Sequence, residues 1–200
     1  RILMMMRKFW TQHGAVATAV LVLVAAALGF YLRMQPYLNL YRIGFASMYP
    51  SAKLDELDPY INYWLVSYLE KHGPDAWFIL TRDNPDTCIF WYPNCRDIAF
   101  TELPGHIYTI YILYQIAKPL GIELMDFMAL IPPFLASITV IGIALLVHEL
   151  TGSKIGALTA SWLFVPMFLS RLSAGFVVKY SFGLAVAPFV IWLHIAAIRR

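Results

Sequence analysis

The chain has 200 residues, of which 60% are hydrophobic and only 14% are charged. A soluble globular domain carries about 25% charged residues, so this composition excludes an ordinary soluble domain and indicates a membrane protein. The formal net charge is +3, and the basic residues stand mainly beside apolar segments, where they orient helices in the bilayer. Membrane lipid is therefore an expected partner, and nucleic acid is not.

The N-terminal part predicts a membrane span at residues 14–33, preceded by a cytoplasmic segment at 1–13. The run from Gly14 to Leu32 is apolar and is close to the roughly 20 residues that cross a hydrocarbon core. A cleaved signal peptide is the alternative, but the run is long and no clear small-residue cleavage site follows it. Arg7 and Lys8 ahead of the run place the N-terminus in the cytoplasm.

Three further apolar runs predict spans at residues 127–148, 155–170 and 181–198, with a short outer loop at 171–180. The segment 103–118 is apolar only at its centre, which is too short to cross comfortably. We therefore expect it to lie in the membrane interface as an amphipathic helix. The predicted fold is an all-α polytopic membrane protein with four transmembrane helices.

The positive-inside rule favours four spans over five. With four spans, Lys154 between the second and third spans lies in the cytoplasm, as do Arg199 and Arg200 after the fourth. A fifth span at 103–118 would put both of these arginines outside. The distribution of basic residues therefore agrees with an interfacial helix at 103–118.

Residues 34–126 then form one extracytoplasmic loop, which contains every acidic residue of the chain except Glu149. A connection this long is uncommon unless it folds and carries function. Asp58 followed by Pro59 predicts that a helix covers 58–72, because aspartate is a favoured N-cap and proline a favoured first helical residue.

The loop also contains the two cysteines of the chain, Cys88 and Cys95, in one polar stretch. A disulfide between them is expected only if this stretch faces an oxidising compartment. Two free thiols are an equally good interpretation of the sequence.

Glu56 and Asp58 form the sharpest candidate site. Two carboxylates separated by one residue can present oxygens to a hard divalent cation such as Mg²⁺ or Mn²⁺, which also binds water and substrate phosphates. The alternative is that Asp58 only caps a helix, which is a very common role for this residue type. The two roles are compatible with each other.

Arg171 and Lys179 follow the third predicted span, on the same side of the membrane as Asp58. Because a guanidinium forms forked hydrogen bonds to phosphate oxygens, these two residues are candidates for holding a pyrophosphate. The alternative is that both side chains snorkel to the lipid headgroups, as basic residues at span ends commonly do.

Four segments, in order along the chain, resemble landmarks of the catalytic subunits of AglB/PglB-type oligosaccharyltransferases, which are glycosyltransferases of the GT-C class. They are LDELDPYINYW (54–64), WYPNCR (91–96), LPG (103–105) and SRLSAG (170–175). The resemblance covers nearly the whole chain and implies a GT-C-like fold with a large first external loop and a helix lying along the membrane. It also implies a cell-membrane protein whose active face is extracytoplasmic.

The resemblance implies transfer of a glycan from a polyprenyl (dolichyl) phosphate or pyrophosphate carrier to the asparagine of an Asn-x-Ser/Thr acceptor protein. Asp58 then matches the residue that binds the metal, Mn²⁺ or Mg²⁺, and touches the acceptor amide. Glu56 occupies a more variable acidic position, and Arg171 matches an arginine that lines the family's site. Lys179 and Arg96 are further candidates for binding the lipid phosphate or the acceptor.

The sequence departs from the family at its second acidic motif, which would fall at Val178, Lys179 and Tyr180, where neither ligand position is acidic. A site with one carboxylate fewer binds a cation more weakly, and a lysine opposes the cation further. Three explanations are open: the metal site is completed from elsewhere, a lysine partly replaces the metal, or catalysis is lost.

The family's later spans and its soluble acceptor-recognition domain would follow residue 200, so these 200 residues alone are expected to be inactive. Two alternatives to N-glycosylation are open. One is another lipid-sugar-dependent glycosyltransferase of the GT-C class, of the protein O-mannosyltransferase type. The other is a non-catalytic membrane assembly subunit in which Asp58 caps a helix.

Overall fold

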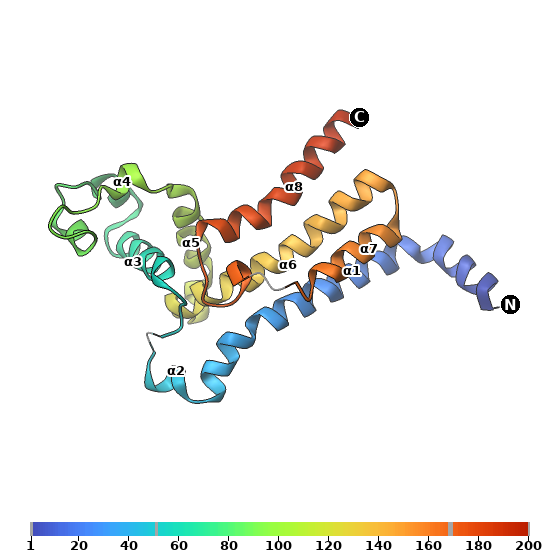
Figure 1. Ribbon diagram of the computed structural model, residues 1–200, viewed down its shortest axis with the longest axis horizontal. Coiled ribbons are helices and arrows are strands. Elements are labelled where there is room, and N and C mark those ends of the chain that lie inside the picture. Colours follow the sequence, from blue (N-terminus) through green and yellow to red (C-terminus); the bar gives the residue numbers. More distant parts are fainter. Residues whose placement is uncertain (1, 51, 168–169, 200) are drawn as a thin grey trace.

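A computed structural model describes residues 2–50, 52–167 and 170–199 of the chain (Figure 1). Every regular element in these ranges is a helix. Three of the helices contain segments long and apolar enough to cross a membrane: Gly14–Arg42 within α1 (Ile2–Arg42), and the whole of α6 (Leu124–Thr151) and α8 (Lys179–Arg199). The chain is therefore an all-α integral membrane protein, as its composition predicts.

Helix α6 is the centre of the bundle, where it packs against α1, α7 (Lys154–Phe164) and α8. Its buried face includes small residues such as Ala136, Gly142 and Ala144. Small side chains allow close approach of neighbouring helices in a membrane, and a Cβ built on Gly142 would lie 2.8 Å from the Phe189 ring of α8. The contact between α6 and α8 therefore depends on glycine at this position.

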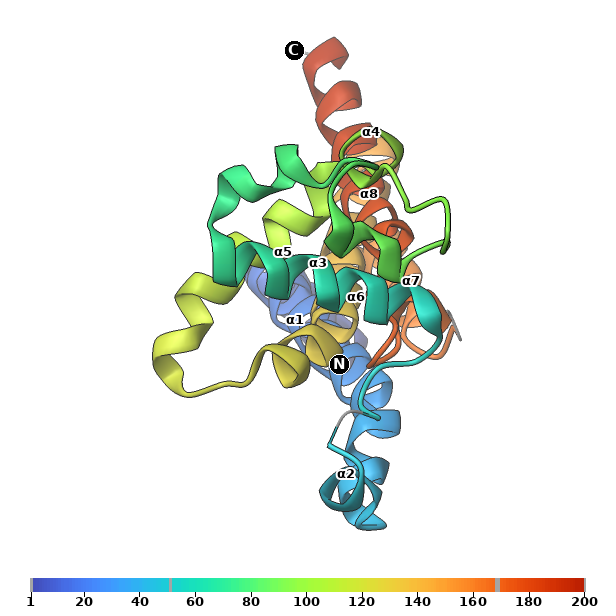
Figure 2. The same cartoon turned by 90° about the vertical axis from the view of Figure 1, so that its left-hand side faces the viewer.

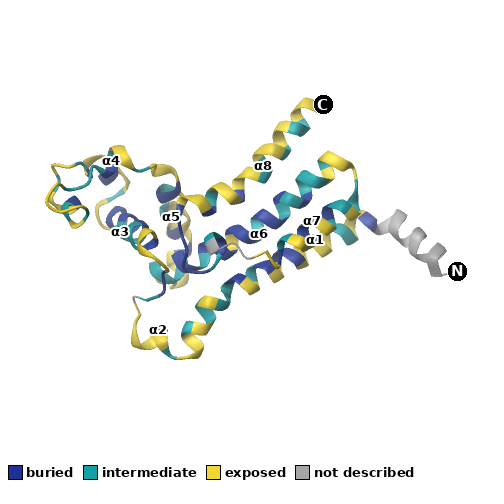
Figure 3. Ribbon diagram, viewed as in Figure 1, coloured by how far each residue is buried: buried dark blue, intermediate teal, exposed yellow. Residues whose placement is uncertain are grey.

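The outer surfaces of the spanning helices are apolar and exposed (Figure 3). Examples are Val20 and Leu23 on α1 and Val190 and Leu193 on α8, each more than half exposed. Contiguous apolar surface of this kind is unusual on a soluble protein and is the expected surface of helices that lipid surrounds.

Helix α7 differs from the span expected at 155–170, because it ends at Phe164 after 11 residues. At 1.5 Å per residue it is about 16 Å long, roughly half of a hydrocarbon core. Val165 after the helix keeps helical dihedral angles, but Pro166 has no backbone N–H with which to continue the hydrogen bonding of the helix. The chain turns there, so α7 fills only the first part of the expected third crossing.

Arg33 of α1 secures the end of α7. Its side chain is only 5% exposed, and its guanidinium donates hydrogen bonds to the carbonyls of Phe164 (3.2 Å), Val165 (3.3 Å) and Met167 (2.9 Å). The last carbonyls of a helix lack partners within the helix and carry partial negative charge. Arg33 satisfies them, which allows α7 to end inside the bundle.

The ends of the bundle differ. The C-terminal end of α1, the start of α6 and the start of α8 lie at one end, together with the described residues of 43–50 and 52–123; we call it the loop end (Figure 1). The turn at Gly152 between α6 and α7 lies at the opposite end, toward which the N-terminal part of α1 also runs. Asp58 and Lys179 are therefore at the same end, and Lys154 is at the other.

Short helices make up the loop region at the loop end. They are α2 (Phe45–Met48), α3 (Leu57–His72), η1 (Pro74–Ile79), η2 (Pro85–Ile89), α4 (Ile98–Thr101), α5 (Pro104–Ala117) and η3 (Lys118–Leu120). Helices α3 and α5 run across the end of the bundle, as the two perpendicular views show (Figures 1 and 2). Helix α5 covers most of the segment 103–118, for which the sequence predicts a helix; its position in the membrane interface stays a prediction.

The loop region shares one apolar core with the membrane bundle. Buried side chains from α3, η1, α5 and α6 meet in it, and the members that are almost fully excluded from solvent include Leu65, Leu69, Trp77, Ile107 and Met128. Burial of each such side chain contributes about 1.5–3 kcal/mol. The loop region is therefore fixed to the start of α6.

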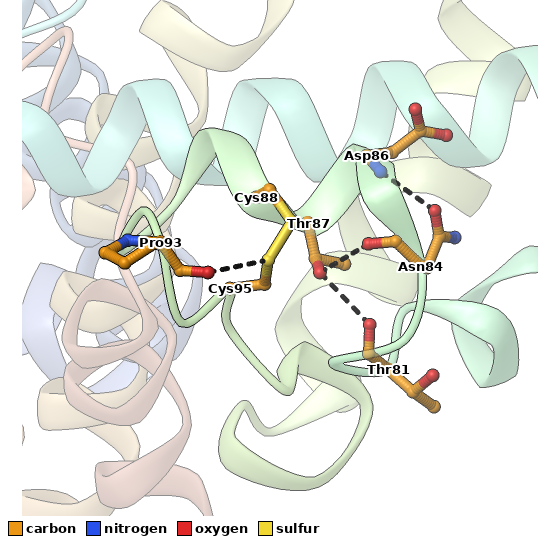
Figure 4. Close-up of a disulfide and its surroundings, with 7 residues drawn as sticks. All are labelled: Thr81, Asn84, Asp86, Thr87, Cys88, Pro93 and Cys95. Carbon is orange, nitrogen blue, oxygen red and sulfur yellow. Dashed lines mark hydrogen bonds between the residues drawn. A yellow bond between two sulfur atoms is a disulfide. The ribbon is translucent and has the colours of Figure 1, made fainter.

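Cys88 and Cys95 form a disulfide in the part of the loop region farthest from the bundle (Figure 4). Next to it, the buried Thr87 hydroxyl donates to the carbonyls of Thr81 (3.0 Å) and Asn84 (2.8 Å). Of the two interpretations that the sequence allows, the structure has the disulfide. It closes the loop that leads from η2 to Arg96.

Candidate functional site

A polar cavity of about 200 Å³ lies at the loop end, where α3, α5 and the start of α8 meet. Its lining combines carboxylates, cations and neutral polar groups in one place. The lining residues are Asp58, Ile61, Asn62, Arg96, Glu102, His106, Val178, Lys179 and Tyr180. The cavity therefore brings together three of the residues that the sequence singles out for chemistry, Asp58, Arg96 and Lys179.

Asp58 does not act as the N-cap of α3. The helix begins at Leu57 with Glu56 at the N-cap position, where φ is +62°, and no side chain makes a capping hydrogen bond. The prediction that Asp58 caps the helix is therefore wrong: the chain bends at Glu56 and places Asp58 inside the first turn. No described residue pairs with the exposed Asp58 carboxylate, so this group is available to a ligand.

Glu56 lies outside the cavity and faces Arg171. The shortest distance between the Glu56 carboxylate and the Arg171 guanidinium is 3.8 Å, and both side chains are substantially exposed. Arg171 also lies over the rings of Phe176 (4.3 Å to the centroid) and Tyr180 (5.9 Å). Tyr180 lines the cavity, so Arg171 lies next to one of its lining residues and Glu56 is paired with Arg171 outside the lining.

Glu102 joins the two cations of the cavity. Its carboxylate forms a close ion pair with Arg96 and a looser one with Lys179 at 3.8 Å. Arg96 also stacks over the ring of Trp91, 4.8 Å from its centroid. Arg96 therefore has two close partners, whereas Lys179, whose side chain is 44% exposed, makes the 3.8 Å contact with Glu102 and lies 6.0 Å from the centroid of the Tyr180 ring.

Asn62 connects α3 to the segment before α8. Its amide donates to the carbonyl of Val177 at 2.9 Å, and its oxygen lies 3.3 Å from Nε2 of His106. Asp58 lies four residues earlier and thus on the same face of α3, one turn away. The buried Asn62 amide therefore holds Asp58 opposite the start of α8.

Gly175 positions the chain on the other side of the cavity. Its N–H donates to the carbonyl of Ala129, and its own carbonyl accepts from the N–H of Asp55, both at 2.9 Å. Its φ is +87°, and a Cβ at this position would lie 2.9 Å from the backbone oxygen of Lys53. Only glycine fits this junction of α6, the segment before α3 and the segment before α8.

Replacing Gly175 with alanine is expected to destabilise the protein by about 2–3 kcal/mol, because the methyl group meets backbone and the positive φ disfavours a side chain. The measurement is the thermal midpoint in detergent. The matched control is Gly183→Ala, since nothing lies within 4 Å of a Cβ at Gly183. An equal or higher midpoint for Gly175→Ala than for the control would contradict the assignment.

His106 is a buried, neutral member of the cavity. Burial lowers the pKa of His106 below its usual range. The charge of Glu102 and a hydrogen bond with the Leu103 backbone raise the pKa in part, and the charge of Lys179 lowers it further. A histidine whose pKa is lower in the folded state contributes stability above its unfolded pKa near 6.5, and this contribution is lost as pH falls through the folded value.

Stability is therefore expected to decline as pH falls below about 6.5, and His106→Gln is expected to flatten this decline. Thermal midpoints between neutral and mildly acidic pH measure both slopes. His72→Gln is the control, because His72 is exposed on the last turn of α3. If the thermal midpoint of His106→Gln falls as steeply with pH as that of the parent protein, the pH dependence comes from other groups.

The cavity does not offer a full ligand set for a divalent cation. Mg²⁺ and Mn²⁺ sites rely on several oxygen ligands, but the described part of the chain has no group of three histidine, cysteine or acidic side chains suited to a metal. Asp58 offers one carboxylate, and the carboxylate of Glu102 is engaged by two cations. Val178 and Tyr180 present no carboxylate from the start of α8.

Sequence reasoning missed Asn62, Glu102 and His106. Asn62 lies within the LDELDPYINYW segment, and Glu102 and His106 flank LPG, so proximity to these landmarks was the available signal. Their roles depend on contacts between residues far apart in the sequence, such as the one between Asn62 and His106. The sequence pattern alone does not contain such contacts.

Comparison with known proteins agrees with the motifs. The family model described as "Oligosaccharyl transferase STT3, N-terminal" matches residues 27–200. A rice protein (Oryza sativa subsp. japonica), the "Dolichyl-diphosphooligosaccharide--protein glycosyltransferase subunit STT3B", is 28% identical over 128 residues, which are 62% of this chain and 17% of that protein. The chain thus spans a small part of this relative's length. It belongs to the STT3 family of oligosaccharyltransferase membrane subunits, with the family's N-terminal membrane region.

Proposed function

We propose that the protein containing this chain transfers an oligosaccharide from a polyprenyl (dolichyl) phosphate or pyrophosphate carrier to the asparagine of Asn-x-Ser/Thr acceptor proteins. The observation that carries this proposal is the cavity at the loop end. There, the carboxylate of Asp58, which pairs with none of the described residues, shares one space with the cations of Arg96 and Lys179. Membership of the STT3 family supports the reaction class.

The two kinds of charge suit the two halves of the reaction. The acceptor amide nitrogen forms a bond to the anomeric carbon of the sugar, while the bond from that carbon to the carrier oxygen breaks and the phosphate leaves with the electron pair. Asp58 is the candidate to accept the amide proton and orient the nitrogen. Lys179 and Arg171 are the candidates to stabilise the negative charge that develops on the phosphate.

We also propose that the loop end faces the extracytoplasmic side of a cell membrane. The disulfide between Cys88 and Cys95 supports this orientation, because disulfides persist in oxidising compartments. The acidic residues gather in the loop region, whereas Lys154 and Arg199 lie toward the other end, as the positive-inside rule expects for a cytoplasmic face.

The metal, Mn²⁺ or Mg²⁺, is part of the family resemblance. Asp58 would be one of its ligands, and the described residues provide no complete site. The assay is therefore run with and without the metal ion. The roles proposed above for Asp58, Lys179 and Arg171 do not require a metal.

The test is a transfer assay with the full-length protein, a lipid-linked oligosaccharide and a fluorescent Asn-x-Thr peptide, with and without Mn²⁺. A glycosylated peptide is expected, and a Gln-x-Thr peptide is expected to stay unmodified. Absence of product under both metal conditions, from protein shown to be folded, would refute the proposal.

A second candidate is a non-catalytic assembly subunit, which the apolar Val178 and the aromatic Tyr180 at the start of α8 favour. Such a subunit would glycosylate none of the peptides and would co-purify with other membrane subunits. An O-mannosyltransferase would instead modify a Ser/Thr peptide that lacks asparagine, so the same assay separates the three functions.

A further inference from the structure

The charges around the cavity balance without a metal ion. Asp58 and Glu102 provide two negative charges, and Arg96 and Lys179 provide two positive charges in the same lining. A divalent cation would be placed among two existing cations and would have one unpaired carboxylate as a ligand. Like charges at close range repel strongly. The lining therefore disfavours a further cation, and an anionic ligand needs a cation of the lining that can leave its present partner.

Lys179 is the cation that is free to move. Arg96 is held by its close ion pair with Glu102 and by the Trp91 ring. The Lys179 ammonium is 3.8 Å from Glu102 and 6.0 Å from the centroid of Tyr180, with no hydrogen bond to either. Because the Glu102 carboxylate stays paired with Arg96, Lys179 can move away from this carboxylate and contact a ligand instead.

Two cations lie near the same aromatic ring in the lining of the cavity. The guanidinium of Arg171 is 5.9 Å from the centroid of Tyr180, and the ammonium of Lys179 is 6.0 Å from it. Lys179 is also the first residue of α8, whose first turn contains no acidic residue. An anion beside Tyr180 would thus lie near both positive groups without a carboxylate from α8 opposing it.

We propose that the ammonium group of Lys179 takes the place of a divalent cation in this cavity and binds a phosphoryl anion together with Arg171. This inference rests on the proposed function, in which the anion is the phosphate or pyrophosphate of the isoprenoid carrier. Lys179 neutralises the charge that the leaving phosphate acquires, and the binding step needs no metal.

The first experiment measures binding of inorganic pyrophosphate to the full-length protein in detergent by calorimetry, with EDTA present. Saturable binding is expected, and Lys179→Met is expected to weaken it at least tenfold. The control is Lys71→Met, an exposed lysine on the last turn of α3, which should bind like the parent protein. Equal affinity of Lys179→Met and the parent protein, or no binding by the parent protein, would overturn the proposal.

The second experiment measures binding of Mn²⁺ alone by electron paramagnetic resonance. The parent protein is expected to show no saturable site that depends on Asp58. A triple variant, Val178→Asp with Lys179→Asn and Tyr180→Glu, is expected to gain one, because it adds two carboxylates and removes the lysine. A Mn²⁺ site in the parent protein that Asp58→Ala abolishes would overturn the proposal, even if the triple variant does not fold.

Competition identifies the source of the anion. Farnesyl pyrophosphate, a soluble isoprenoid pyrophosphate, is expected to displace inorganic pyrophosphate, and vesicles of phosphatidylglycerol are not. Displacement by the vesicles alone would assign the site to lipid headgroups and overturn its assignment to the carrier. Loss of glycan transfer with intact Lys179-dependent binding would refute only the proposed function, so the two failures are distinguishable.

Discussion

Asp58→Ala is expected to lower the rate of glycan transfer by about 10²–10⁴-fold, the usual contribution of a positioned general base. The carboxylate is exposed on the first turn of α3, lines the cavity and has no partner among the described residues. Its removal therefore leaves the protein interactions intact and takes away only what a ligand would use. The measurement is the initial rate of peptide glycosylation by the full-length variant.

The matched control is Asp83→Ala, which removes an exposed carboxylate of the same loop region away from the cavity. It should transfer glycan at close to the parent rate. The free energy of unfolding of both variants should stay within about 0.5 kcal/mol of the parent value, the usual range for surface substitutions. Parent-like transfer by Asp58→Ala would show that the acidic motif has a structural role only.

Asp126→Ala is expected to give the largest loss of stability, about 3–5 kcal/mol, because it leaves a buried charge without its partner. The carboxylate of Asp126 lies 2.6 Å from the ammonium of Lys53, whose side chain is 6% exposed. It also accepts hydrogen bonds from the hydroxyls of Tyr37 (2.9 Å) and Tyr41 (3.1 Å). This cluster joins α1, the segment before α3 and α6.

Burial lowers the pKa of Lys53, but its hydrogen bonds with Asp126 and Tyr41 more than offset this, so the pKa is raised. A lysine with a raised pKa contributes stability below its unfolded pKa near 10.4, and this contribution is lost as pH rises through the folded value. The loss in Asp126→Ala is therefore expected at neutral pH, where thermal unfolding in detergent measures it. Glu123→Ala is the control, because Glu123 is 76% exposed and 3.8 Å from Lys53; exposed pairs contribute about 0–1 kcal/mol.

If Asp126→Ala unfolds at the same temperature as Glu123→Ala, the ion pair with Lys53 contributes nothing measurable. A lower midpoint together with reduced transfer is the expected result, because this cluster lies next to the junction at Gly175 that positions Asp58.

The sequence predicts the helical membrane class well, because hydrophobic runs of span length are a direct consequence of bilayer thickness. It also predicts α5 as a separate element. Pro166 was an available signal for the end of α7, but the hydrogen bonds that Arg33 donates to the carbonyls at this end could not be predicted, because Arg33 lies more than a hundred residues earlier. Tertiary hydrogen bonds of this kind leave no periodic signal.

The candidate site follows the same pattern. Asp58, Arg96 and Lys179 can be found from residue type and family resemblance, and they do line one cavity. The contact of Arg171 with Glu56, and the ion pair of Glu102 with Arg96, depend on how segments of the chain pack against one another and leave no pattern in the sequence. The sequence predicts that Asp58 caps α3, but the chain bends at Glu56 and Asp58 lies within the first turn of the helix.

The proposed function requires that the Asp58 cavity is open to water on the extracytoplasmic face, and labelling of single cysteines in intact cells tests this directly. The two cysteines of this chain are joined in a disulfide, so within these 200 residues a maleimide that cannot cross membranes reports only an introduced thiol. Asp58→Cys is expected to react in intact cells, and Lys154→Cys at the other end of the bundle only after permeabilisation. Labelling of Lys154→Cys but not of Asp58→Cys in intact cells would contradict the proposed orientation and, with it, the proposed function.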